Sequence, residues 1–423
     1  MSTRGGPPTT FGEALFRGLA PDGGLYMPAD RPRLDEAVRP DGTDVAETAR
    51  WVTSAVVGDG VTASLLSDVT AAALDFPLPL VEIEPGLHVL ELFHGPTLAF
   101  KDVGARFMAC LMHALDPGLH PRTVLVATSG DTGSAVARAF HGMDGYRVVV
   151  LFPARGISSR QRRQMTTLGG NVTAVSVDGT FDDCQRLAKE AFADLRLAAE
   201  TGLTSANSIN VGRLVPQSVY YVHAALTLGW EGPRATFVVP SGNLGNLTAG
   251  LLARWGGMPA TGFVAASNVN RVFPDYLESG SFRPRPSVPT ASNAMDVGAP
   301  SNLERIRWLY DDDLARLRAD VRGAWCDDDE TRRWIADVHE RTGYLLDPHT
   351  AVGYGALQKK RPERGPSVLL ATAHPAKFPR IVEEATGRSV VVPETLASTL
   401  DAEEHILDIR PDIGVLRRML IES

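Results

Sequence analysis

The segment TVLVATSGDTGSAVARAFHGMDGYRVVVLF, residues 123–152, decides the fold class. It starts with a run of β-branched and apolar residues and then passes through a loop of small polar residues and glycine. A helical pattern follows, and a second apolar run closes the segment. A short apolar strand followed by a helix and another strand is typical of parallel βα units. The segment therefore predicts a parallel sheet with helices packed on its faces.

Further apolar runs and helical stretches extend this pattern along the chain. A second series starts at residue 236 with TFVV and is again followed by a small-residue loop and a helix. Two such series predict an α/β fold of two doubly wound domains with a cleft between them, where ligands bind at the carboxyl ends of the strands. The other expected elements are a helix that follows the loop at residues 128–133 and ends near His141, helices over residues 158–168 and 181–195, and strands over residues 146–152, 171–177, 263–266 and 368–371.

The expected division of the chain follows from where these series begin. The N-terminal part holds a turn at residues 21–24 and a helix over residues 44–57, without the strand, glycine loop and helix seen later. The expected units are an N-terminal segment over residues 1–85, a large α/β domain from residues 86–120 and 232–423, and a small α/β domain over residues 121–231.

Composition and charge exclude several classes of protein. The 423 residues have a net charge of −8 and scattered basic residues, unlike the concentrated positive charge of a nucleic-acid-binding protein. The short basic run at residues 160–163 is interpreted as a solvated helix face. No apolar run approaches the ~20 residues of a membrane helix, and the N-terminus lacks the apolar core of a signal peptide. Three separated cysteines and no HExxH pair indicate neither a disulfide framework nor a metal site, so we expect a cytoplasmic enzyme.

Two loops have the composition of anion-binding sites. Residues 240–248, PSGNLGNLT, and residues 127–134, ATSGDTGS, each follow a strand and open a helix. Glycines allow backbone N–H groups to approach an anion closely, and the helix N-terminus adds favourable partial charge. One such loop in each domain suggests a cofactor with a phosphate and a substrate with an acidic group. Each loop taken alone is also compatible with a tight turn that binds nothing.

Lys101 lies among apolar neighbours in the segment FHGPTLAFKD, residues 93–102. It begins an amphipathic helix whose apolar residues recur near helical spacing. A lysine buried among apolar groups has a lowered pKa and can act as a Schiff-base nucleophile. Most lysines in such surroundings extend their ammonium group to water instead, and the segment alone leaves both interpretations open.

Two further segments are rich in small polar residues. Residues 203–213, LTSANSINVGR, end on Arg213, which is suited to bidentate pairing with a phosphate or carboxylate. A capped helix start explains the same serine and asparagine residues. Residues 371–378, ATAHPAKF, follow a strand and can supply one hydrogen bond to a heteroaromatic nitrogen, although an ordinary turn has the same composition.

Taken together, the chain resembles the threonine synthase family, in particular its longer bacterial and fungal branch. The matching segments occur in the family's order and extend over essentially the whole chain, which makes the combination very specific. They are GLAPDGGLYMP (from Gly18), ELFHGPTLAFKDVGARFMA (from Glu91), ATSGDTGSAV (from Ala127), SANSIN (from Ser205), VPSGNLGNLTAGLLA (from Val239), SNAMDVGAPSN (from Ser292), LDPHTAVGY (from Leu346) and TAHPAKF (from Thr372).

The resemblance implies a fold-type II pyridoxal-phosphate enzyme. Lys101 matches the lysine that binds the cofactor covalently, and Thr372 matches the residue that hydrogen-bonds the pyridine nitrogen, where a neutral hydroxyl leaves the ring nitrogen unprotonated. The implied cradle for the cofactor phosphate consists of Ser241, Gly242, Asn243, Leu244, Gly245 and Asn246. Substrate contacts are implied for Thr128, Ser129, Asp131, Thr132, Ser158, Asn207, Ser208 and Arg213.

The sequence departs from the wider family at two places. Asp131 stands where many relatives of this fold type have asparagine, although this branch often has aspartate. Residues 155–159 lack the Ser-Pro pair that is common at Ser158 and Ser159, and the run at residues 160–163 is more basic than the family pattern. In relatives this segment lies near the substrate phosphate, so the departure concerns substrate specificity.

The activity that the resemblance implies is the last step of threonine biosynthesis. O-phospho-L-homoserine and water would give L-threonine and phosphate by γ-elimination and β-addition. A phospho-lyase that releases 2-oxobutyrate and ammonia, or a specialised paralogue acting on a related γ-substituted amino acid, would carry the same cofactor residues. The intact lysine, phosphate loop and threonine argue against a non-catalytic homologue. The sequence is compatible with a monomer or a homodimer.

Overall fold

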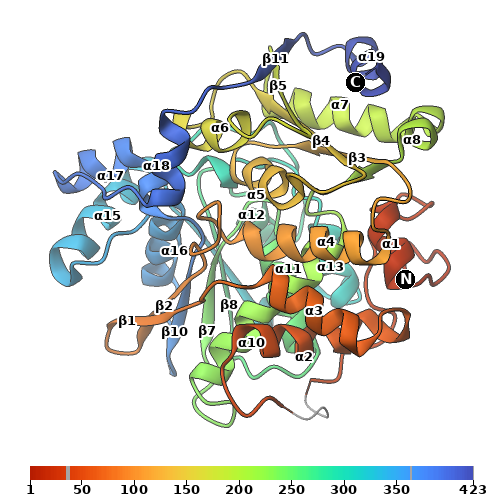
Figure 1. The fold of residues 1–423 in the computed structure, drawn as a ribbon. Helices are drawn as coiled ribbons and strands as arrows, with labels where there is room; N and C mark the ends of the chain where they lie inside the picture. The colour runs from red at the N-terminus through yellow and green to blue at the C-terminus, as the bar shows by residue number, and fades with distance from the viewer. Residues whose placement is uncertain (35–38, 363, 423) are drawn as a thin grey trace.

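Two sheets organise the chain, and strands distant in sequence assemble each of them (Figure 1). The computed structural model describes residues 1–34, 39–362 and 364–422. The first sheet has the strand order β1 (Leu80–Glu84), β2 (Leu87–Glu91), β10 (Ser367–Ala371), β7 (Thr236–Pro240), β8 (Gly262–Ser267) and β9 (Val321–Trp325). The second has the order β11 (Ile406–Ile409), β5 (Val172–Val177), β4 (Tyr146–Pro153), β3 (Arg122–Ala127) and β6 (Leu203–Ser205). All neighbouring strands are parallel except β1 and β2, which form a hairpin.

Helices fill most of the sequence between these strands. In the first half they are α1 (Phe11–Arg17), α2 (Val45–Val57), α3 (Ala63–Ala73), α4 (Lys101–Leu115), α5 (Asp131–Phe140), α6 (Ser159–Thr166), α7 (Phe181–Ala193), α8 (Leu195–Thr201), α9 (Val211–Leu214) and α10 (Ser218–Thr227). In the second half they are α11 (Gly245–Trp255), α12 (Val272–Ser279), α13 (Leu303–Leu309), α14 (Leu314–Asp320), α15 (Asp328–Thr342), α16 (Pro348–Lys359), α17 (Pro379–Thr386), α18 (Glu394–Leu400) and α19 (Ile413–Glu422). Short 3₁₀ turns are η1 (Gly58–Gly60), η2 (Val215–Gln217), η3 (Asn293–Met295) and η4 (Pro375–Lys377).

Both faces of the central strands of each sheet are buried, which explains the continuous apolar runs in the sequence. Successive strand residues point to opposite faces, so Phe237 of β7 packs with Tyr221 of α10 while Val238 joins the core formed with α16. In the second sheet α5 covers one face and α7 the other, and Leu125 of β3 packs in the same core as Leu187 of α7. A parallel sheet covered on both faces by helices is the arrangement that the sequence predicts.

Helix α4 lies between the two sheets and belongs to a core that both share. Its buried residues Val103, Phe107 and Leu111 lie in the same cluster as Val124 of the second sheet and Phe237 of the first. The helix contacts α5 of the small domain and α3 of the N-terminal segment. Since Lys101 is the first residue of α4, this packing places the lysine between the two sheets.

The strands and helices expected from residues 123 to 195 are confirmed, as are the strands of the second series. The hairpin of β1 and β2 and the strands β6, β9 and β11 were not predicted. Sheet membership also differs from the expected division, because β11, at the C-terminal end of the expected large domain, pairs with β5 of the small domain. The N-terminal helices do not form a separate unit either, because α3 packs on α4 and α2 packs on α10.

The basic run at residues 160–163 is not the solvated helix face that we expected. Arg162 and Arg163 of α6 bind Glu404, with N–O distances of 3.0 and 3.3 Å, and Arg163 also donates to the carbonyl of Thr399. These contacts hold α18 and the segment after it against α6, next to strand β11. The prediction failed because the acidic partner lies about 240 residues away along the chain.

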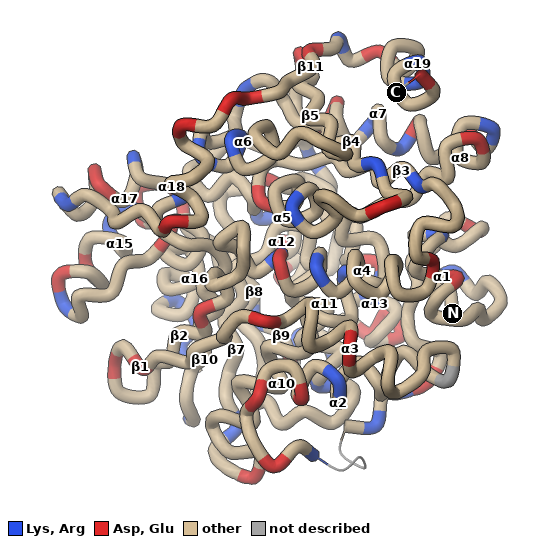
Figure 2. The backbone as a smooth tube through the Cα atoms, viewed as in Figure 1, with Lys and Arg blue, Asp and Glu red and all other residues tan. Residues whose placement is uncertain are grey.

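Charged residues are otherwise spread over the whole molecule, with both signs interspersed (Figure 2). Within the described ranges, no helix is long and apolar enough to cross a membrane. The same residues contain no group of three or more histidine, cysteine or acidic side chains that could hold a metal ion.

Arg305 of α13 fixes the N-terminal segment to the loop before α9. Its guanidinium is fully buried and donates to the carbonyls of Tyr26 (3.1 Å), Ser208 (2.9 Å) and Ile209 (2.7 Å) and to the side chain of Asn302 (2.7 Å). Burial lowers the pKa of this guanidinium to about 9. One side chain therefore satisfies acceptors from three segments that are distant in sequence.

We expect Arg305→Met to lower the free energy of unfolding by about 3 kcal/mol or more, because it leaves several buried carbonyl groups without a donor. Urea denaturation followed by fluorescence measures the change. The matched control is Arg316→Met, which removes an exposed arginine paired with Asp311 and should change the free energy by less than about 1 kcal/mol. Equal denaturation midpoints for the two variants would contradict the role of Arg305.

Candidate active site

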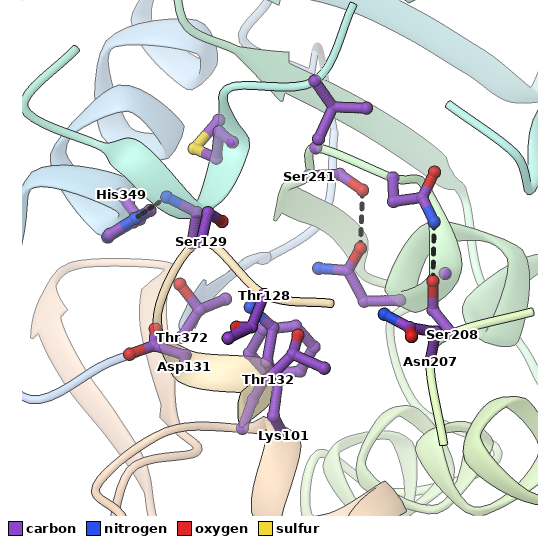
Figure 3. A pocket seen from close by; sticks show the side chains of 18 of the residues that line it. Lys101, Thr128, Ser129, Asp131, Thr132, Asn207, Ser208, Ser241, His349 and Thr372 are labelled. Carbon is purple, nitrogen blue, oxygen red and sulfur yellow. Dashed lines mark hydrogen bonds between the residues drawn. The ribbon is translucent and has the colours of Figure 1, made fainter. Parts of the chain in front are cut away.

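The position of Lys101 is fixed by a short bridge to the end of strand β10. The N–H of Phe100 donates to the carbonyl of Thr372 at 2.9 Å, and the N–H of His374 donates to the carbonyl of Leu98 at 3.1 Å. Leu98 has a positive φ of 58°, a conformation that costs a non-glycine residue energy and is concentrated at functional sites. Figure 3 shows Lys101 rising into the pocket, with Thr372 on one side and Asn207 and Ser208 on the other.

The Lys101 amine is desolvated and lies among several charged groups. Burial lowers its pKa to about 8, the carboxylate of Asp131 acts in the opposite direction, and the cations Arg213 and Lys377 lower it further. Asp102, next to the lysine, is turned away and accepts hydrogen bonds from the N–H and hydroxyl of Thr97 at 2.8 and 2.7 Å. The lysine therefore combines a depressed pKa with access to a pocket, the two properties that a Schiff-base nucleophile requires.

The loop between β7 and α11 has the geometry of an anion cradle. Among the described residues, the N–H groups of Gly242, Asn243 and Leu244 donate to no protein acceptor, although they stand at the N-terminus of a buried helix. Leu244 adopts a left-handed conformation with a φ of 61°, and Asn246 accepts a hydrogen bond from the hydroxyl of Ser241 at 2.6 Å. Free amides at a helix N-terminus bind anions such as a phosphate group.

The loop between β3 and α5 forms the small-domain wall of the pocket. The hydroxyl of Thr128 accepts from the N–H groups of Gly130 and Gly133, both at 2.9 Å, and thereby shapes the turn. Ser129, Asp131 and Thr132 line the pocket from this loop and from the start of α5. The side chain of Asp131 is almost fully buried, and the ammonium of Lys377 holds its pKa well below the usual range in spite of that burial.

Arg213 is a buried cation without an acidic partner among the described residues. Its Nη1 donates to the carbonyl of Ala206 at 2.5 Å, while its Nε is buried without any hydrogen-bond partner. Burial lowers its pKa to about 10. Nearby, the hydroxyl of Ser208 accepts a hydrogen bond from the side-chain amide of Asn243 at 2.6 Å. This bond joins the loop before α9 to the loop between β7 and α11. An unpaired buried guanidinium that lines a pocket favours binding of an anion there.

The structure brings most of the predicted site residues into this one pocket. The exceptions are Leu244, whose side chain is buried under the loop, and Ser158, which caps α6 and donates its hydroxyl to the carbonyl of Lys377 at 3.1 Å. The predicted residues that line the pocket are Lys101, Thr128, Ser129, Asp131, Thr132, Asn207, Ser208, Arg213, Ser241, Gly242, Asn243, Gly245, Asn246 and Thr372.

Sequence reasoning missed His349, which lines the pocket from the first turn of α16. Its Nδ1 lies 2.7 Å from a carboxylate oxygen of Asp347, and its Nε2 accepts from the N–H of Ala294 at 3.2 Å. The imidazole thus holds the 294–297 segment, which forms another wall of the pocket. Asp347 two residues before a histidine was the available signal, but only the fold shows what the ring contacts.

Comparison with known proteins agrees with this geometry. The family model described as "Pyridoxal-phosphate dependent enzyme" matches residues 76–373. Models described as "Threonine synthase N terminus" and "Threonine synthase, C-terminal" match residues 1–74 and 350–420. The three models together extend over nearly the whole chain.

Individual proteins are similar over the same length. A threonine synthase of Escherichia coli is 41% identical over 418 residues, with 97% of this chain and 96% of the relative covered. The crystal structure of the Escherichia coli enzyme superimposes with a TM-score of 0.92, at 40% identity and with 98% and 97% of the two chains covered. A pyridoxal-phosphate-bound threonine synthase from Brucella melitensis also gives 0.92, at 36% identity and with 100% and 98% covered. The predicted fold-type II architecture and cofactor are confirmed, and the chain belongs to the threonine synthase family of pyridoxal-phosphate-dependent enzymes.

Proposed function

We propose that the chain converts O-phospho-L-homoserine and water to L-threonine and inorganic phosphate. The observation that supports this most directly is the unpaired Arg213 guanidinium in the same pocket as Lys101. A cofactor phosphate occupies one anion site, and a phosphorylated substrate needs a second one. The amides of the 242–244 loop provide the first, and Arg213 provides the second.

The residues around the pocket fit pyridoxal phosphate. Lys101 holds the cofactor covalently, and its depressed pKa leaves a fraction of the amine unprotonated near neutral pH. The amides at the start of α11, in the cradle formed by residues 241–246, would hold the cofactor phosphate. The hydroxyl of Thr372, which directly follows β10, would hydrogen-bond the ring nitrogen. When bound, the cofactor supplies an electron sink for the substrate carbon skeleton.

The opposite wall receives the substrate. Ser129 and Thr132, at the N-terminus of α5, lie where hydroxyl and amide donors can hold a carboxylate. Arg213 and Ser208 bind the substrate phosphate from the other side, with Thr128 and Asn207 shaping the loops between them. When the substrate's amino group takes the place of Lys101, the freed Nζ of Lys101 would accept the proton from Cα, and the surrounding buried walls would limit access of bulk water.

The first experiment follows phosphate, threonine and 2-oxobutyrate together while the purified holoenzyme acts on O-phospho-L-homoserine. We expect phosphate and threonine in equal amounts, because water adds to the substrate in the same pocket that releases phosphate. Phosphate with 2-oxobutyrate would instead identify a phospho-lyase. No phosphate from an enzyme that holds its cofactor would indicate a specialised paralogue with another γ-substituted amino acid as substrate.

Gly242→Ala tests the phosphate cradle. A methyl group at this position would lie 2.8 Å from the carbonyl oxygen of Ala294 and from Cα of Met295, so backbone has to move. We expect the affinity for pyridoxal phosphate to fall by about tenfold or more, which corresponds to roughly 1.4 kcal/mol. Equilibrium titration of the apoenzyme measures it, and Gly42→Ala, which meets nothing within 4 Å, is the matched control. Unchanged affinity in Gly242→Ala would contradict the assignment.

Arg213→Met tests the second anion site. We expect kcat/KM for O-phospho-L-homoserine to fall by about 100-fold, the effect of removing one partner of a buried charge pair. Spectroscopic titration with L-threonine serves as the internal control, because this ligand has no phosphate and should bind with unchanged affinity. A loss of affinity that is equal for both ligands would show that Arg213 supports the fold of the pocket and does not bind the phosphate.

A further inference from the structure

Lys377 is a second buried lysine beside the active site, and the proposed reaction gives it no role. It lies in η4 after strand β10, and its side chain is completely buried. Its ammonium is 2.7 Å from Oδ1 of Asp131 and donates to the carbonyl of Thr97 at 2.8 Å. Lys377 does not line the pocket itself, so any effect on the reaction acts through Asp131, which does.

One oxygen of the Asp131 carboxylate is contacted by two side chains, which approach it from different elements. Oδ1 binds Lys377 of the large domain and also accepts from the side-chain amide of Gln161 in α6 at 2.9 Å. Oδ2 has no hydrogen-bond partner among the described residues. This arrangement holds the carboxylate by Oδ1 and leaves the other oxygen for the pocket that Asp131 lines with Lys101.

The charges around Lys101 come from four elements. Asp131 of α5 favours the protonated amine, while Arg213 of α9 and Lys377 of η4 oppose it. Asp102, the neighbour of Lys101 in α4, is hydrogen-bonded to Thr97 and interacts only electrostatically with Lys377 and Arg213.

Two histidines also lie near the pair. His349 of α16 acts on Asp131, and His374 interacts with Lys377, although burial lowers the pKa of His374 to about 4. The Nε2 of His349 accepts the N–H of Ala294 at 3.2 Å, and its Nδ1 lies 2.7 Å from Oδ1 of Asp347. Lys377 is the cation in direct contact with Asp131, at 2.7 Å.

We propose that Lys377 is a positioning residue: its ion pair orients the Asp131 carboxylate and offsets its charge, and thereby sets the protonation of the Lys101 nitrogen. This inference rests on the proposed role of Lys101 as the cofactor-binding lysine. Without Lys377, the uncompensated buried carboxylate of Asp131 would attract a proton to the Lys101 nitrogen in the same pocket. The same ion pair connects α5, which carries Asp131, to η4, which carries Lys377. Loss of the pair would therefore change both the charge near Lys101 and the contact between these two elements.

Three variants separate a charge effect from a structural one. Lys377→Met removes the cation at similar side-chain volume, Asp131→Asn removes the anion, and the double variant removes both. The readout is the pH midpoint of the visible absorbance of the holoenzyme, which reports protonation at the Lys101 nitrogen. We expect a shift of about one unit to higher pH for Lys377→Met and to lower pH for Asp131→Asn, with the double variant returning close to the wild-type midpoint.

The control is Lys359→Met, which breaks a lysine ion pair with Glu330 far from the pocket and should leave the midpoint unchanged. Equal midpoints in all three test variants would overturn the proposal, and so would shifts of the same sign in both single variants. If Lys377→Met does not fold, the double variant must still have a higher midpoint than Asp131→Asn. Borohydride reduction followed by peptide mapping shows separately whether the cofactor is on Lys101. A label elsewhere refutes the proposed function, whereas a label on Lys101 with no shift refutes only this inference.

Discussion

The hydrogen-bonded bridge between residues 98–100 and 372–374 is the constraint on which the site depends. It joins the start of α4 to the end of β10, so the lysine that begins the helix lies beside the residue that ends the strand. Helix α4 is in turn packed between both sheets, in a core that includes residues of each. The lysine is therefore held by the fold as a whole, and the positive φ of Leu98 shows that the backbone accepts strain to maintain the connection.

Around this point the molecule buries charges that a folded protein normally keeps in water. Asp131, Lys377 and Arg213 are each almost completely buried, and burial of an ion costs several kcal/mol unless it is paired. Asp131 and Lys377 compensate each other, while Arg213 has only carbonyl and distant carboxylate neighbours. A site that contains one neutralised ion pair and one buried cation without an ionic partner can bind an anion. Binding of that anion offsets the free energy that burial of Arg213 costs the folded protein.

Much of the fold could be predicted because its parallel strands are buried on both faces and therefore appear as continuous apolar runs, as in β4. Strand β1 is only half-buried and β11 pairs with a strand some 230 residues earlier, so neither has a local signal. The loops of the site were predictable because small and polar residues follow strands there. His349 and the partner of Asp131 were not, because their roles depend on contacts between residues distant in sequence.

The unusual segment at residues 155–163 bears on specificity in a different way than the sequence suggests. Ser158 and Arg160 donate to the carbonyls of Lys377 and Ala376, and Gln161 donates to Asp131. None of these three side chains lines the pocket, yet all hold the ion pair or the turn that carries it. A change in this segment therefore acts on the wall of the pocket through the Asp131–Lys377 pair. Arg213 and Ser208, whose polar groups line the pocket itself, are the residues that we propose to discriminate the substrate phosphate.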